Sequence, residues 1–161
     1  MKKHLIAAGL ALAVVVPVTA VFAQRAIDDK GFVTLKLGDE QWTDYPGIPG
    51  IRIMVVEGDP KKPGPYVIRV KFEPGTMSMP HFHPEDRLVT VLKGTWWTGK
   101  GEIFDPESTE PLPAGGYMKH PSKEAHYDGA KDEEVILQIA GMGPSGTTFF
   151  KPDLGATGRS R

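Results

Sequence analysis

Short apolar runs separated by turn residues repeat along most of the chain. Glycine and proline, together 34 of the 161 residues, fall between these runs and leave no room for a long helix. The runs are rich in valine, isoleucine, threonine and aromatic residues, and residues 66–72 alternate in part between apolar and polar positions, as a half-buried strand does. Many short strands with frequent turns indicate an all-β fold, a sandwich or a barrel. The pattern predicts seven strands, at residues 32–37, 51–57, 66–72, 88–92, 95–98, 117–120 and 134–140.

The first 23 residues have a different pattern from the rest of the chain. Two lysines near the start are followed by an apolar stretch at residues 5–18 and by the small-residue sequence Val21-Phe22-Ala23. This is the pattern of a secretory signal peptide, residues 1–23, cleaved after Ala23, and it predicts a periplasmic or secreted protein. An uncleaved membrane anchor is the alternative, but the apolar stretch is shorter than the roughly 20 residues that a spanning helix needs. After cleavage we expect no association with a membrane.

The remaining residues have the length and composition of one soluble domain. We expect this domain to span residues 24–154 and a mobile polar tail to follow at residues 155–161. Without the two lysines of the signal, 17 basic side chains stand against 20 acidic ones, a net charge of −3, and no basic patch suggests nucleic acid as a partner. The chain has no cysteine, which excludes disulfides, thiolate catalysis and cysteine metal ligands.

The four histidines of the predicted domain lie in two short segments, with His81 and His83 in the first and His120 and His126 in the second. Residues two apart in a strand point to the same face, so His81 and His83 are expected side by side, about 7 Å apart along the backbone. Two imidazoles at this spacing can converge on one metal ion with bonds of about 2.1 Å. The alternative is a coincidence of surface or core positions without a ligand.

The residues on both sides of His81 and His83 follow the spacing of a known motif. Five residues separate Gly75 from His81, three separate His83 from Arg87, and six separate Arg87 from Gly94. This pattern resembles the first sequence motif of the cupin superfamily. In that motif a glutamate normally stands where this chain has Arg87.

A second group of residues follows in the order that the superfamily shows. Five residues separate Gly115 from Pro121, and His126 follows. This segment resembles the second cupin motif, with two departures: Lys123 stands where a glycine is usual, and Ala130 where an asparagine is frequent. The resemblance covers roughly residues 66–141.

The resemblance implies a double-sheet jelly roll, the cupin β-barrel, with the two histidine segments on facing inner strands. His81, His83 and His126 match the three histidine ligands of the family, which implies a divalent metal ion. Iron or manganese is favoured, and zinc, nickel and copper are compatible with the same donors. His120 matches no ligand position, so we expect it to face solvent or to support a ligand from behind. A homodimer is expected by analogy.

Arg87 changes the charge of such a centre. If the divalent ion lies about 5 Å from the guanidinium of Arg87, the two repel by roughly 6–7 kcal/mol at an effective dielectric constant near 20. Three resolutions are open. An anionic substrate or enolate can bind the ion and Arg87 together. Glu85 or Asp86 can neutralise Arg87, although the turn at residues 83–86 is expected to point both outward, and an inward Glu85 can even be a fourth ligand. The third is a pocket without a metal.

A three-histidine centre without a fixed carboxylate resembles the acetylacetone-cleaving and thiol dioxygenases of the superfamily. It therefore implies a metal-dependent dioxygenase, or an isomerase or hydrolase if the ion is redox-inert. The substrate is expected to be a small anionic or enolisable molecule held by Arg87 and by Met79, which is predicted to line the pocket. No catalytic base is evident, and Tyr127 and His120 are candidates by sequence proximity alone. The rival interpretation is a periplasmic module that binds a small ligand or a metal without turnover.

Overall fold

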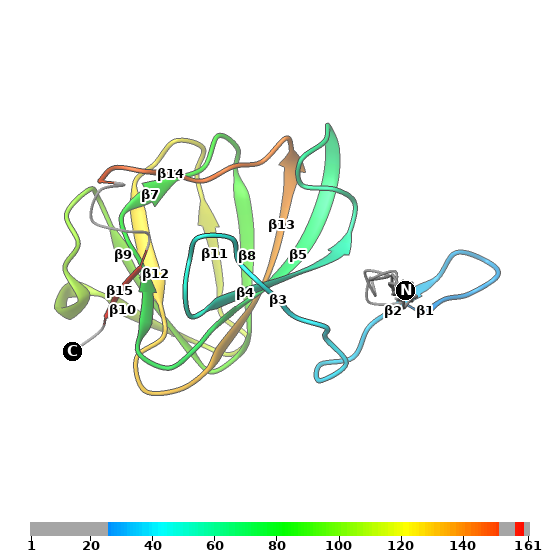
Figure 1. Ribbon diagram of the computed structural model, residues 1–161, viewed down its shortest axis with the longest axis horizontal. Coiled ribbons are helices and arrows are strands. Elements are labelled where there is room, and N and C mark those ends of the chain that lie inside the picture. The colour runs from blue at the N-terminus through cyan, green and yellow to red at the C-terminus, as the bar shows by residue number, and fades with distance from the viewer. Residues whose placement is uncertain (1–25, 152–156, 160–161) are drawn as a thin grey trace, which may run out of the picture.

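Two antiparallel β-sheets packed face to face make up the body of the protein (Figure 1). The computed structural model describes residues 26–151 and 157–159, so the predicted signal segment, residues 1–23, lies outside the described residues. A short pair of strands, β1 (Ala26–Ile27) and β2 (Val33–Thr34), precedes the sheets. In the described ranges no helix has the length and apolar character to cross a membrane.

The first sheet has six strands in the order β11-β8-β13-β5-β4-β3. The long pairing of β5 with β13 runs from Gly64 opposite Gly143 to Phe72 opposite Val135, and it forms the centre of the sheet. Alternate residues of β8 are buried, as expected for a strand with one face on the core. The strands are β3 (Thr43–Asp44), β4 (Ile51–Glu57), β5 (Gly64–Phe72), β8 (Arg87–Lys93), β11 (Tyr117–His120) and β13 (Val135–Gly143).

The second sheet has the order β10-β9-β12-β6-β15, and β7 joins it by pairing with both β12 and β14. A 3-10 helix, η1 (Pro106–Ser108), lies between β9 and β10. The strands of this sheet are shorter and more polar than those of the first sheet. They are β6 (Thr76–Ser78), β7 (His81–Phe82), β9 (Thr95–Lys100), β10 (Glu110–Pro113), β12 (His126–Gly129), β14 (Thr148–Phe149) and β15 (Thr157–Arg159).

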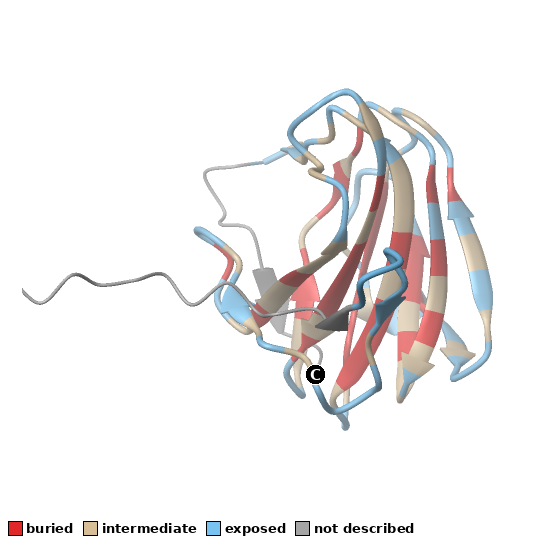
Figure 2. Cartoon of the chain, turned by 90° about the vertical axis from the view of Figure 1, so that its right-hand side faces the viewer, coloured by how far each residue is buried: buried red, intermediate tan, exposed pale blue. Residues whose placement is uncertain are grey.

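The apolar core fills the space between the sheets (Figure 2). Trp96 comes from the second sheet, and Tyr66 and Leu137 from the first, and each is 1% exposed. Burying an aliphatic or aromatic side chain of this kind contributes roughly 1.5–3 kcal/mol. The core includes Ile48, Ile51, Tyr66, Ile68, Val70, Phe72, Val89, Val91, Trp96, Ala130, Val135, Leu137 and Ile139.

The two packed antiparallel sheets confirm the predicted all-β jelly roll. Six of the seven predicted strands are present with small changes of boundary. The strand predicted at residues 32–37 is reduced to Val33–Thr34, and Phe32 and Leu37 at its two ends are 67% and 51% exposed. In the segment predicted to be a mobile tail, Thr157–Arg159 instead forms β15, which pairs with β6.

The turn between β11 and β12 contains a lysine in a backbone conformation that is typical of glycine. Lys123 has a φ of 64°, a left-handed conformation that costs a residue with a Cβ roughly 1–2 kcal/mol. Its amide donates a hydrogen bond of 2.8 Å to the carbonyl of His83. The conformation therefore joins the loop before His126 to the segment that carries the first histidine pair.

We predict that Lys123→Gly stabilises the protein by about 0.5–1 kcal/mol, because relief of the left-handed conformation exceeds the entropy that glycine adds to the unfolded chain. The free energy of unfolding in urea is the measurement. Lys61→Gly is the matched control, since Lys61 lies in an exposed turn without a positive φ. A Lys123→Gly protein that is no more stable than the Lys61→Gly protein contradicts the prediction.

Candidate metal centre

Strand register brings the histidines together at one end of the protein interior. His126 of β12 lies opposite His81 of β7, and His120 of β11 lies opposite Arg87 of β8. The two motif histidines thus occupy neighbouring strands of one sheet, which corrects the expectation that their segments lie on facing strands. His120 is the histidine that comes from the opposite sheet.

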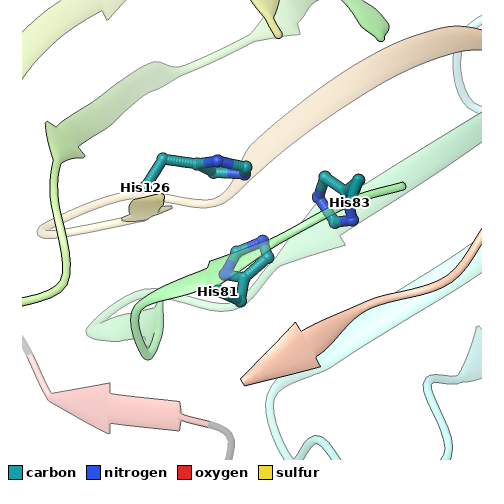
Figure 3. A group of neighbouring side chains, drawn as sticks. All are labelled: His81, His83 and His126. Carbon is teal, nitrogen blue, oxygen red and sulfur yellow. The ribbon is translucent and has the colours of Figure 1, made fainter. Parts of the chain in front are cut away.

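The imidazole rings of His81, His83 and His126 converge on one point (Figure 3). Their ring centroids are 4.8 Å apart for His81 and His83, 4.4 Å for His81 and His126, and 5.1 Å for His83 and His126. One nitrogen from each ring lies within 4.8 Å of the other two. Each residue is 4–6% exposed, so the three rings form a buried group.

Hydrogen bonds to backbone carbonyls fix the tautomer of all three rings. A carbonyl oxygen can only accept, so each Nδ1 carries the proton and each Nε2 keeps its lone pair. Such a bond from the second nitrogen is typical of histidines that bind metals. The bonds run from His81 to Met79 (2.8 Å), from His83 to Gly146 (2.8 Å) and from His126 to Glu124 (2.9 Å).

Burial keeps these imidazoles neutral, as metal ligands must be. Burial, with the neighbouring His126 second, lowers the pKa of His81 to about 3. Burial likewise lowers the pKa of His126 to about 4, and burial followed by the charge of Arg87 lowers the pKa of His83 further. Three neutral Nε2 donors that share one focus fit a divalent ion of the zinc, iron, nickel or copper type.

A cavity of about 60 Å³ adjoins the rings of His81 and His83. Its polar wall includes His81, His83, Arg87, His120 and Asp128, and the rest is mainly apolar. The apolar wall includes Val70, Phe72, Val89, Trp96, Leu137, Ile139 and Phe149. His120 and His126 also line a larger hollow of about 590 Å³, between the ends of β9, β11 and β12.

Sequence comparison places the chain in a family. Residues 30–145 match the profile of the ChrR cupin-like domain. The chain belongs to this cupin family. No relative was found among curated proteins.

Solved structures share this cupin fold at low sequence identity. The polyketide cyclase RemF from Streptomyces resistomycificus has a TM-score of 0.57 and 16% identity, over 74% of this chain and 87% of RemF. The DMSP lyase DddQ from Ruegeria pomeroyi has a TM-score of 0.57 and 17% identity, over 70% of this chain and 62% of DddQ. KdgF from Halomonas sp. has a TM-score of 0.51 and 19% identity, over 66% of this chain and 89% of KdgF. At these identities the likeness shows a common fold.

Arg87 of this cupin is buried and has a carboxylate partner. Its Nε lies 3.2 Å from Oε1 of Glu85, and its Nη2 donates to the hydroxyl of Ser145. The Tyr66 hydroxyl donates to the same Glu85 oxygen at 2.7 Å. Burial alone would raise the pKa of Glu85, but hydrogen bonds from Ser145 and Tyr66 and the charge of Arg87 together lower it.

The turn at residues 83–86 sends its two acidic side chains in different directions. Asp86 points outward to the exposed Lys119, 2.7 Å away, as the sequence predicts. Glu85 is 12% exposed and turns inward, which corrects the expectation that it points outward. Its charge offsets that of Arg87, so the second of the three resolutions, a local carboxylate partner, is the one found here. Glu85 is in neither potential ligand group.

Met79 does not line the cavity beside the rings. Its carbonyl contacts His81, but the residue lines a separate cavity of about 290 Å³ with Phe104 and Phe150. The reason is that β6 ends at Ser78 and β7 begins at His81, so strand alternation is interrupted between Met79 and His81.

Two polar residues complete the buried group: Asp128, which was not predicted, and His120, which was predicted either to face solvent or to support a ligand. His120 is 4% exposed rather than solvent-facing, and Asp128 is 5% exposed. Burial raises the pKa of Asp128 to about 7, although hydrogen bonds and Arg87 oppose this in part. The sequence carried a signal for Asp128, because a residue two positions after His126 in a strand shares its face.

We predict that the metal-free protein loses stability as the pH falls from 6.5 towards 4. In this pH range the unfolded chain binds protons at histidines that stay neutral in the folded protein. Proton binding therefore stabilises the unfolded state, and the free energy of unfolding falls. For His126 alone, a pKa that falls from 6.5 to about 4 corresponds to about 3 kcal/mol. Asp128 acts in the opposite sense, because its raised pKa contributes stability at low pH that is lost as the pH rises through about 7.

Urea denaturation with a chelator present, at pH 7 and pH 5, measures this loss. Asp128→Asn removes the opposing group and should make the loss at pH 5 larger than in the unchanged protein. Equal or greater stability of the unchanged protein at pH 5 contradicts the prediction.

Proposed function

We propose that this protein is a metal-dependent cupin enzyme that acts on a small anionic or enolisable molecule. One observation carries the proposal: three buried neutral histidines, each fixed by a carbonyl, direct their Nε2 atoms to one point. Nε2 of His126 is buried without a hydrogen-bond partner among the described residues, and such an atom is costly unless something binds it. His81, His83 and His126 would hold one divalent ion, with iron or manganese favoured. Bound there, the ion would supply Lewis acidity or, for iron, reactivity towards dioxygen.

The cavity supports a small ligand. About 60 Å³ accommodates few heavy atoms, and its largely apolar wall suits a short hydrocarbon portion. Arg87 lines the same space beside His83 and provides a guanidinium for a carboxylate or enolate, which it would share with Glu85. RemF, a polyketide cyclase, and DddQ, a DMSP lyase, show that this fold supports small-molecule enzymes.

The second candidate function is a binding module without turnover. One observation favours it: Tyr127, a candidate base, does not line the cavity, since its hydroxyl bonds to the Ser108 hydroxyl and the Asp105 carbonyl, both at 3.0 Å. Product formation from a bound ligand distinguishes the two candidates. In either case we propose an exported protein, because residues 1–23 have the pattern of a cleaved signal, and the N-terminus of the mature protein tests this.

We predict that the purified protein binds about one divalent ion per chain and that the double variant His81→Ala, His126→Ala binds none. The double change removes two of three donors, including the one on β12. Elemental analysis and calorimetric titration with Fe, Mn, Zn, Cu and Ni measure the ion content. Circular dichroism of the metal-free proteins controls for folding. A native protein that takes up none of these ions refutes the proposed function.

The charge beside the ion is tested by a pair of substitutions. Arg87→Glu would set a second carboxylate beside Glu85, so the neutral Arg87→Gln is the cleaner change. It should tighten metal binding at least tenfold, about 1.4 kcal/mol, because it removes the positive charge of Arg87 and leaves the negative charge of Glu85. Glu85→Gln should weaken metal binding, because the charge of Arg87 is then uncompensated.

Pyruvate serves as a carboxylate-bearing, enolisable probe for the same variants. Arg87→Gln should weaken pyruvate binding to the metal-loaded protein while it tightens the metal itself. Both affinities are measured by calorimetry. If Arg87→Gln changes neither of them, Arg87 has a structural role with Glu85 and Ser145, and an anionic substrate loses its support.

A further inference from the structure

We propose that His120, His126 and Asp128 form a second ligand position for the same ion, and that this position is the stronger one before substrate binds. The inference rests on the proposed function in one respect, namely that a divalent ion binds in this cavity. It assigns a ligand role to His120 and Asp128, neither of which matches a ligand position of the two motifs.

The second group meets the same distance criterion as the first. One ligand atom from each residue lies within 4.8 Å of the others. The rings of His120 and His126 have centroids 3.7 Å apart, and Oδ2 of Asp128 lies 3.9 Å from Nε2 of His126. Ligands on a tetrahedral ion with bonds of about 2.1 Å lie about 3.4 Å apart, so small side-chain movements complete the site.

Two ring nitrogens of this group lack a hydrogen-bond partner among the described residues. Nε2 of His120 and Nε2 of His126 are both buried and accept or donate no hydrogen bond among the residues that the structure describes. Buried polar atoms are almost always paired, so two orphaned nitrogens on neighbouring rings point to a missing occupant. A cation between them and the Asp128 carboxylate would satisfy both nitrogens at once.

His126 belongs to both groups, and this makes the two positions exclusive. Its Nδ1 is bonded to the carbonyl of Glu124 at 2.9 Å, so only Nε2 is available to a metal. One nitrogen binds one ion. The centre therefore holds a single ion that takes either the His81–His83 side or the His120–Asp128 side.

Charge decides between the two sides. The first group consists of neutral imidazoles, and it shares its cavity with the positively charged Arg87. The second group includes a carboxylate, which stabilises a divalent cation directly. Two histidines and one carboxylate are also the ligand set of many ferrous sites. Asp128 thus supplies a negatively charged ligand, which the glutamate of the first motif would supply if Arg87 did not stand in its place.

Zinc affinity of single variants, measured by competition with a chelator, tests the proposal. Asp128→Asn and His120→Gln should each lower the affinity at least tenfold, and each by more than His83→Ala does. Asp86→Asn is the matched control, because it removes the same charge from an exposed carboxylate outside the cavity, and it should change the affinity less than twofold. If either Asp128→Asn or His120→Gln binds zinc as the unchanged protein does, the proposal is overturned.

A second measurement avoids the variants, in case they fold poorly. In crystals of the unchanged protein loaded with zinc, the anomalous signal should lie within bonding distance of Asp128 and His120. A signal bonded to His81 and His83 but not to Asp128 overturns this inference and leaves the proposed function intact. A protein that binds no divalent ion at all overturns both.

Discussion

The pairing of β12 with its neighbours is the interaction on which the whole centre depends. β12 carries both His126 and Asp128, and it pairs with β9 along one side and with β6 and β7 along the other. The approach to β6 is so close that a Cβ added at Gly129 would lie 2.3 Å from the Thr76 carbonyl oxygen. Only glycine permits this contact. The contact at Gly129, the last residue of β12, thus fixes the strand and with it the position of His126, its first residue.

Strand length and polarity decide which parts of the fold could be predicted from the sequence. Strands of the first sheet contain apolar runs long enough to show their period, and β4, β5, β8 and β13 were predicted almost in full. The strands β6, β7, β12 and β14 have two to four residues and several polar side chains. Their pairing is decided by tertiary contacts, which a local pattern does not contain.

The site shows a similar division. The family motif was sufficient to predict that the rings of His81, His83 and His126 meet, but not that His81 and His126 lie on neighbouring strands of one sheet. Glu85 was placed wrongly and His120 was left between two alternatives, since their direction depends on partners far away in sequence. Glu85 is drawn inward by Tyr66 and Arg87, and His120 is set by the pairing of β11 with β8. Neither partner can be identified from the residues next to them.

The buried charges give a physical reason for an arginine in a cation-binding cavity. Arg87 and Glu85 form an ion pair, which is neutral as a unit, and an isolated buried charge at either position would be strongly unfavourable. The histidines contribute no charge because burial holds them neutral. With a divalent ion bound as proposed and Asp128 ionised, one positive charge remains uncompensated. A monoanionic substrate makes the cavity neutral, and the guanidinium of Arg87, which lines the same cavity, is the group that can hold it there.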